Sequence, residues 1–171
     1  MKNSSNYRIL GIDPGTAIVG WGVVDIFRSS IEVVAYGDIR TSKDDKEEDR
    51  LLEIGIDFGN LIETYKPNVV SIEKIFYFKN QKTVISVAQA RGVIVYISKN
   101  YNIPVYSYTP LQIKQSLTGY GKADKKQMQA MVQKKLNLPE IPKPDDTADA
   151  LAVAVCHDNF RRFASLVQKS I

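Results

Sequence analysis

The pattern of apolar and polar positions near the N-terminus predicts three consecutive strands. Apolar residues dominate Tyr7–Asp13, and the turn residues Pro14-Gly15-Thr16 follow directly. Two further runs, Ile18–Ile26 and Ile31–Ile39, are rich in residues that favour strands and are joined by the polar stretch 27–30. Because such short connections join antiparallel neighbours, these three strands are predicted to form a meander.

Helices and strands alternate in the next part of the chain. The elements predicted from periodicity are a helix over 51–62, a strand over Asn68–Glu73, a helix over Val84–Ile97 and a strand over Ile103–Tyr108. The acidic run 44–49 suits the positive end of the first helix, and Pro67 ends that helix. The strand that follows is apolar enough to be of the buried parallel type.

The last third of the chain is predicted to be helical. Thr109-Pro110 supplies an N-cap and a first helical residue, and two amphipathic helices flank Gly119-Tyr120-Gly121. A final helix is expected to begin after Pro144, with Asp145 as its N-cap, and to run towards Phe163.

This order predicts one α/β domain over residues 1–171, with a mixed five-stranded sheet flanked by helices. Residues 1–5, residues 119–124 and the tail after Ala164 are the segments expected to be loosely ordered. At 171 residues the chain is long enough to bury a full core.

Composition narrows the class of protein. The single cysteine, Cys156, excludes an internal disulfide and a multi-cysteine zinc site, and it favours a reducing compartment. No signal peptide and no membrane-spanning stretch is apparent. The chain is therefore expected to be soluble and cytoplasmic, without a membrane partner.

Charge is distributed unevenly along the chain. Residues 1–73 carry 8 basic and 13 acidic groups, whereas residues 74–144 carry 12 basic and two acidic groups. Such a block either binds a polyanion or solvates helix faces. The candidates for binding DNA in this block are Lys79, Lys82, Arg91, Lys114, Lys122, Lys125 and Lys126.

Four carboxylates occupy positions at which their negative charge must be balanced by a proton or a cation. Asp13 and Glu73 end apolar strands, and burying a lone carboxylate costs several kcal/mol. Asp146 and Asp149 are three residues apart near the start of a helix, so both project from one face, and the apolar stripe behind them would pack that face on the sheet. This brings the helical pair towards the strand ends.

A cluster of four such acids favours divalent cations. Two like charges about 4 Å apart repel by roughly 4 kcal/mol at an effective dielectric of 20. A site with oxygen ligands alone suits Mg²⁺ or Mn²⁺. Two such ions can activate a water molecule and stabilise the leaving oxygen in the hydrolysis of a phosphodiester bond. The alternative is that each acid has a separate role: Asp13 closing its turn, Glu73 in an ion pair, and Asp146 and Asp149 stabilising a helix N-terminus.

Six blocks in order, which span nearly the whole chain, resemble the RuvC-type Holliday-junction resolvases, bacterial endonucleases of the RNase H-like superfamily. The blocks are Gly11-Ile12-Asp13-Pro14-Gly15, Ile72-Glu73 with Phe76 close behind, Lys79-Asn80, Gln89-Ala90-Arg91-Gly92, Gln112-Ile113-Lys114-Gln115, and Asp146-Thr147-Ala148-Asp149-Ala150-Leu151-Ala152. The first block alone also opens actin-like ATPases and sugar kinases. The extension before the first strand, Trp21 and the short tail depart from the pattern at its periphery.

The resemblance implies an RNase H-like fold and a Mg²⁺-dependent endonuclease with two ions at Asp13, Glu73, Asp146 and Asp149, which Mn²⁺ would also support. It implies a homodimer that nicks opposed strands of a four-way DNA junction in recombination and repair, working with a branch-migration helicase. Lys114 and Lys125 would lie near the scissile phosphate. Phe76 would stack at the opened junction centre, although core packing is the alternative for this residue.

Two alternative functions remain to be weighed against a junction endonuclease, and two further residues, His157 and Cys156, are reactive types whose roles need stating. A non-catalytic junction-binding module would keep the basic block but have lost turnover, and the presence of all four acids argues against it. An actin-like ATPase would need a second lobe and a second phosphate-binding motif. His157 is expected to have a structural or surface role, and Cys156 to be a small core residue.

Overall fold

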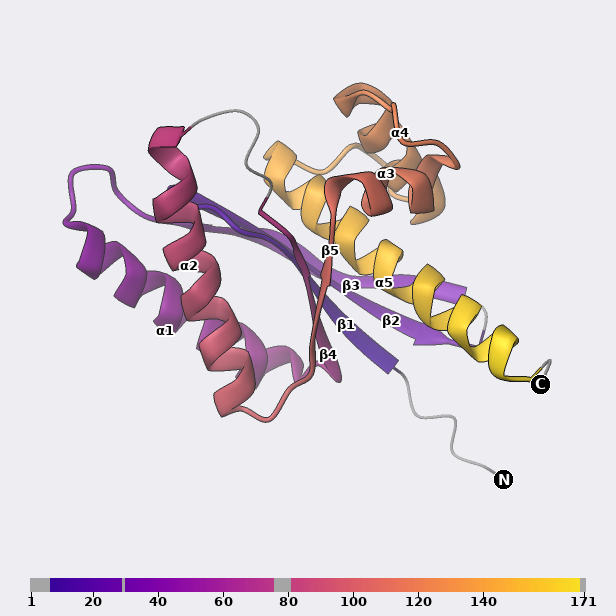
Figure 1. Ribbon diagram of the computed structural model, residues 1–171, viewed down its shortest axis with the longest axis horizontal. Helices are drawn as coiled ribbons and strands as arrows, with labels where there is room; N and C mark the ends of the chain where they lie inside the picture. The colour runs from indigo at the N-terminus through magenta and orange to yellow at the C-terminus, as the bar shows by residue number, and fades with distance from the viewer. Residues whose placement is uncertain (1–6, 29, 76–80, 170–171) are drawn as a thin grey trace.

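The computed structural model describes residues 7–28, 30–75 and 81–169, except for the side chains of 81–83 and 168–169. Within this part the chain forms one five-stranded sheet and five helices (Figure 1). The strands are β1 (Tyr7–Asp13), β2 (Ile18–Phe27), β3 (Ser30–Arg40), β4 (Val69–Glu73) and β5 (Val105–Tyr108). The helices are α1 (Glu47–Tyr65), α2 (Gln81–Asn100), α3 (Pro110–Thr118), α4 (Lys125–Lys135) and α5 (Asp145–Lys169).

The sheet is mixed, as the sequence predicted. Its strand order is β3-β2-β1-β4-β5. The first three strands form the antiparallel meander, whereas β4 lies parallel to β1 and β5 lies parallel to β4. The carboxyl ends of β1, β4 and β5 therefore lie at one edge of the sheet.

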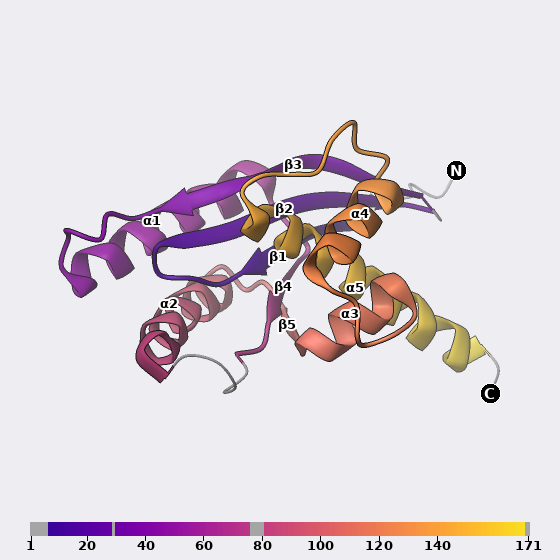
Figure 2. The ribbon, with the colours of Figure 1, turned by 90° about the horizontal axis from the view of Figure 1, so that it is seen from above.

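Helices cover both faces of the sheet and make two apolar cores. Helices α1 and α2 lie on one face, and α5 with α3 and α4 lies on the other (Figures 1 and 2). Phe58 and Ile94 pack with Ile12 in the first core, and Leu151 packs with Ile9 and Met128 in the second. Alternate residues of β1 enter opposite cores because successive strand side chains point to opposite faces.

Local sequence signals explain most helix boundaries. Thr109 caps α3 and Asp124 caps α4, each through a capping box with a glutamine three residues later. Gly119 ends α3 in the left-handed conformation, φ 82°, which glycine adopts without steric cost. The segment 119–124, expected to be loose, is thus bounded by two caps, and Tyr120 donates to Gln127 across it.

Some boundaries differ from the predicted ones. Asp145 is the first residue of α5 rather than its cap, and α5 continues beyond Phe163 to Lys169. Strand β5 begins at Val105, two positions after the predicted start, because the Ile103 amide donates to the Ser98 carbonyl and closes the end of α2 instead.

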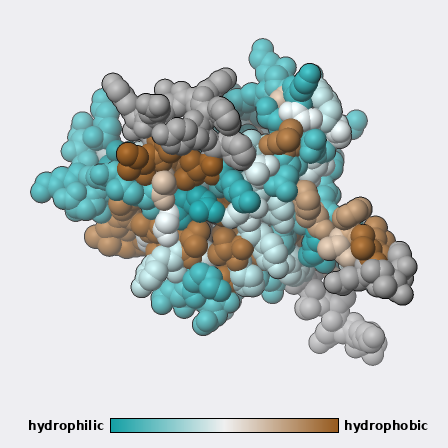
Figure 3. All heavy atoms as spheres, in the orientation of Figure 1, coloured by the Kyte–Doolittle hydropathy of each residue, from teal (hydrophilic) through white to brown (hydrophobic). Residues whose placement is uncertain are grey.

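Several large apolar side chains of α1 and α2 remain exposed. They are Leu52, Ile56, Ile85 and Tyr96. Figure 3 shows apolar side chains gathered on the side of the molecule where α1 and α2 lie. In the described part of the chain, none of the helices combines the length and apolar character needed to cross a membrane.

Candidate functional site

Asp13 and Glu73 lie side by side at the carboxyl edge of the sheet. Each is the last residue of its strand, and the parallel register pairs Ile12 of β1 with Ile72 of β4, one residue earlier. The charge of Glu73 is one of the causes that raise the pKa of Asp13, so the two carboxyl groups lie close together.

Helix α5 brings the other two acids to this edge because it packs unusually close to the sheet. A Cβ atom on Gly20 would lie 2.0 Å from the Asp146 carbonyl oxygen, and one on Gly11 would lie 2.2 Å from the Ala150 carbonyl oxygen. Only glycine permits this approach of two backbones. The Thr147 hydroxyl also donates to the Gly37 carbonyl at 3.2 Å, which fastens the start of α5 to β3.

The four acids act on one another electrostatically. The pKa of Asp13 is raised well above its ordinary value, first by burial and then by the charges of Glu73, Asp149 and Asp146. Burial and the charge of Asp149 raise the pKa of Glu73 to about 7. Burial also raises the pKa of Asp149, against the opposing charge of Lys125. The structure thus brings together all four carboxylates that the sequence singled out.

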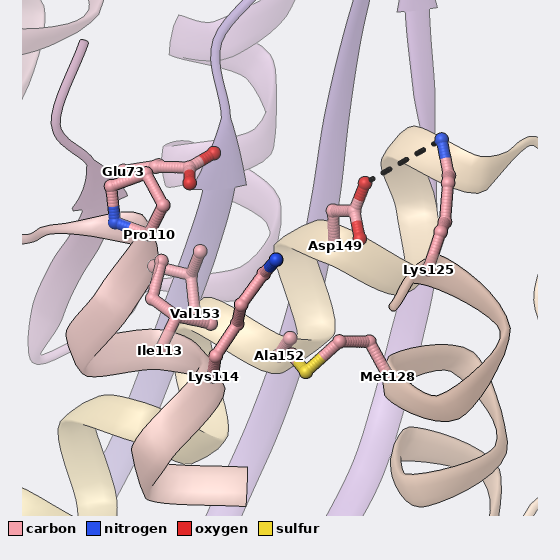
Figure 4. A pocket seen from close by; sticks show the side chains of 9 residues that line it. All are labelled: Glu73, Pro110, Ile113, Lys114, Lys125, Met128, Asp149, Ala152 and Val153. Atoms are coloured by element: carbon pink, nitrogen blue, oxygen red, sulfur yellow. Dashed lines mark ion pairs between the residues drawn. The ribbon is translucent and has the colours of Figure 1, made fainter. Parts of the chain in front are cut away.

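Two lysines face the same acids across a pocket of about 220 Å³. Glu73, Asp149, Lys114 of α3, Lys125 of α4 and Met128 are among the residues that line it, and Asp149 lies between Glu73 and Lys125 in Figure 4. The Lys125 ammonium lies 4.0 Å from a carboxylate oxygen of Asp149. Lys114 lowers the pKa of both Glu73 and Asp149 by its charge, although burial outweighs it at each acid.

The chemistry of this donor set fits a hard divalent cation. Four carboxylates supply oxygen ligands, and burial together with the neighbouring acids raises the pKa of Asp13, a penalty on its charged form that a bound cation would offset. Among the described residues, no three carboxylate, histidine or cysteine side chains already converge as a ready cation cage. Mutual repulsion opposes a closer approach of neighbouring carboxylates, and a bound cation would offset that repulsion.

The other predicted basic residues have different surroundings. Arg91 of α2 is turned inward, since it donates to the Ser107 hydroxyl at 2.8 Å and to the Glu73 carbonyl at 3.4 Å. It joins the ends of β4 and β5 behind the acids. Lys122 and Lys126 are exposed around the start of α4. Phe76 and Lys79 lie outside the described residues, as does the side chain of Lys82.

Two features near the site were missed in the sequence. Asp145 accepts hydrogen bonds from Lys125 and from Gln129 of α4, and no motif marked it. The close packing of α5 on the sheet could have been predicted from the sequence. Gly20 and Gly22 are two residues apart in one strand, so they leave one face of that strand without side chains.

His157 and Cys156 are structural, as expected. His157 is buried between the hydroxyl groups of Tyr7 and Tyr108, at 3.1 and 2.9 Å from its two ring nitrogens. Burial lowers the pKa of His157 to about 4, so the ring stays neutral at physiological pH. Cys156 is a residue of α5, and its side chain is completely buried in the core between α5 and the sheet.

The raised pKa values predict how stability depends on pH in the metal-free protein. The pKa of Glu73 is about 7 in the folded state against 4.5 ordinarily, so between these values the folded protein holds a proton that the unfolded chain has released. The stabilisation is complete below about 4.5 and is lost as the pH rises through about 7. The metal-free protein is therefore expected to melt at a lower temperature at pH 8 than at pH 5, and Mg²⁺ should restore stability at pH 8.

Calorimetric melting of wild type and Asp13→Asn across this pH range isolates the effect of the acid cluster from that of other titrating groups. The variant lacks one of the repelling charges, so its melting temperature should fall less between pH 5 and pH 8. Parallel pH profiles for the two proteins would contradict the electrostatic description of the site.

Comparison with known proteins gives matches over most of the chain. The family model described as crossover junction endodeoxyribonuclease RuvC matches residues 9–157. A protein of that name from Fusobacterium nucleatum is 57% identical over 152 residues, 89% of this chain and 80% of the relative. One from Caldicellulosiruptor saccharolyticus is 52% identical over 151 residues, 88% of this chain and 91% of the relative.

A solved structure matches closely as well. Thermus thermophilus RuvC in complex with Holliday junction substrate superposes with a TM-score of 0.87 at 30% identity, covering 92% of this chain and 96% of that chain. The same protein solved alone gives a TM-score of 0.84.

Proposed function

The chain belongs to the RuvC family of crossover junction endodeoxyribonucleases, and from that premise we propose that it resolves four-way (Holliday) DNA junctions by paired phosphodiester hydrolysis. The observation that carries this proposal is that Glu73, Asp149 and Asp146 lie near enough to Asp13, at one edge of the sheet, for their charges to raise its pKa. Resolution of such junctions serves homologous recombination and DNA repair, and the reaction takes place in the cytoplasm of a bacterium.

The four acids would hold the catalytic cations, with two Mg²⁺ ions per site and Mn²⁺ as a substitute. When bound, such ions lower the pKa of a water molecule and neutralise charge on the phosphate under attack. Asp13 and Glu73 would bind the ions as ionised carboxylates, and Asp146 and Asp149 would supply further oxygen ligands from α5. The reaction passes through no covalent enzyme intermediate, because the attacking group is water.

Two lysines that line the same pocket complete the site. Lys114 and Lys125 face Glu73 and Asp149 and are the cations placed to contact the scissile phosphate. Lys122 and Lys126, exposed beside them, would extend the contact along the DNA backbone, as would Lys79 and Lys82. Phe76 would stack on a base at the junction centre. Arg91 supports the site from within, because its hydrogen bonds join the ends of β4 and β5.

A homodimer would place two such sites on opposed strands. Helix α2 offers a contact surface, since Ile85 and Tyr96 are exposed on it and a Cβ atom on Gly92 would meet none of the described residues within 4 Å. Both features suit a close contact with a second copy. Sedimentation of the protein as a monomer at micromolar concentration would argue against this arrangement. A branch-migration helicase is the further partner that family membership suggests.

The test of this function is cleavage of a synthetic four-way junction labelled on each strand in turn. With Mg²⁺, the protein is expected to introduce paired nicks in opposed strands and to release two linear duplexes, while a linear duplex of the same sequence stays intact. Without Mg²⁺ it should bind the junction and leave it uncut. Binding without nicking in both Mg²⁺ and Mn²⁺ would leave only the junction-binding role.

A further inference from the structure

Asp145, the first residue of α5, has both carboxylate oxygens engaged by α4. The Lys125 ammonium lies 2.9 Å from Oδ2, and the Gln129 side-chain amide donates to Oδ1 at 2.8 Å. Lys125 and Gln129 are four residues apart, so they project from the same face of α4. One carboxylate thus joins the helix that carries Lys125 to the helix that carries Asp146 and Asp149.

The contact matters because Lys125 has a second acidic neighbour. Its ammonium lies 4.0 Å from Asp149, which is one of the acids proposed to bind metal. If Asp145 were absent, the nearest compensation for the ammonium would be Asp149 itself. Lys125 would then close onto a metal ligand and away from the mouth of the pocket where a phosphate would arrive.

Stability of the fold does not account for this pair. Lys125 and Asp145 expose 57% and 54% of their side chains. Ion pairs this exposed contribute little to folding. What the pair does fix is the place of one ammonium group, and misplacement of a reacting group by about 1 Å can reduce a rate substantially.

We propose that Asp145 is a positioning residue, which holds Lys125 at the mouth of the pocket and off Asp149. The inference rests on the proposed function, because it assigns Lys125 to the scissile phosphate. It adds a fifth acid to the site with a role distinct from that of the other four: Asp145 acts through the lysine and contacts neither substrate nor cation.

A double-mutant cycle on cleavage tests this role. Single-turnover rates are measured with saturating synthetic junction in Mg²⁺ for wild type, Asp145→Ala, Lys125→Ala and the double variant. Lys125→Ala is expected to lose about a hundredfold in rate and Asp145→Ala about tenfold. The double variant should match Lys125→Ala within about twofold, because without the lysine Asp145 has nothing to position.

Junction affinity measured without metal separates positioning from a structural effect. Removing an acidic group near DNA should leave affinity unchanged or tighter, so the loss in Asp145→Ala must appear in the rate at saturation. Asp145→Asn keeps an oxygen for the ammonium and should recover part of the rate. Glu53→Ala, an exposed acid on α1, serves as the matched control and should cleave like wild type.

The outcomes distinguish the inference from the proposed function. A wild-type rate in Asp145→Ala, or a further tenfold loss when the change is added to Lys125→Ala, overturns the positioning role while leaving the nuclease assignment intact. Absence of nicking by the wild-type protein contradicts the nuclease assignment itself.

Discussion

Replacing Asp13 by Asn is expected to reduce junction cleavage by about a thousandfold or more, because the bound cations supply several kcal/mol of transition-state stabilisation. Asparagine has nearly the same shape as aspartate and lacks its charge, so it removes the anionic ligand without opening a cavity. Asp13 is the acid on which Glu73, Asp146 and Asp149 all act, which makes it the centre of the cluster.

Binding and folding of this variant should survive. The junction is held by the basic residues, so its affinity without metal is expected to stay close to that of wild type. Because burial and neighbouring charges raise the pKa of Asp13, the neutral side chain should also make the metal-free protein more stable at pH 8. Glu53→Gln, which removes a charge from exposed α1, is the control. Asp13→Asn protein that cleaves at the control rate would remove Asp13 from the catalytic site.

Replacing Gly20 by Ala is expected to damage the site while leaving every acid in place. The added Cβ would lie 2.0 Å from the Asp146 carbonyl oxygen, and a backbone atom cannot rotate away as a side chain can. The start of α5 must therefore move off β2 and take Asp146 and Asp149 with it. The expected cost is about 1–3 kcal/mol of stability and about a hundredfold in cleavage rate.

Gly59→Ala is the matched control for this change. Gly59 lies in α1, and among the residues that the structure describes its added Cβ would have only the Tyr101 hydroxyl within 4 Å, at 3.9 Å. Alanine favours a helix over glycine by about 1 kcal/mol, so this variant should be more stable and fully active. The two substitutions are compared by denaturant unfolding and by single-turnover cleavage. If Gly20→Ala behaved like its control, close packing of α5 would not be what delivers its acids to the strand ends.

The sequence predicted the sheet and the four acids because both depend on local patterns. Alternation and apolar runs located the five strands, and the order of elements made the sheet mixed, as the structure confirms. Family membership confirms the resemblance carried by the six blocks and, with it, the RNase H-like fold. Asp13 and Glu73 stood out because each ends an apolar strand, which is a property of neighbouring residues alone.

Features that depend on contacts between distant segments escaped the sequence. Arg91 looked like one more member of the basic block, yet its guanidinium is used inside the molecule by Ser107 and Glu73. Asp145 looked like a helix cap, and only the packing of α4 against α5 reveals its bond to Lys125. Only the family resemblance singled out Lys114 and Lys125 among the lysines of the basic block. A count of charges treats all members of that block alike.

Anomalous diffraction from crystals soaked in Mn²⁺ tests the central claim most directly, because it locates the cations without relying on activity. Anomalous density is expected in contact with Asp13, Glu73, Asp146 and Asp149, and it should be lost in Asp13→Asn crystals treated identically. Absence of density at these acids, at a Mn²⁺ concentration that supports junction cleavage in solution, would contradict the assignment of the four carboxylates as the metal centre.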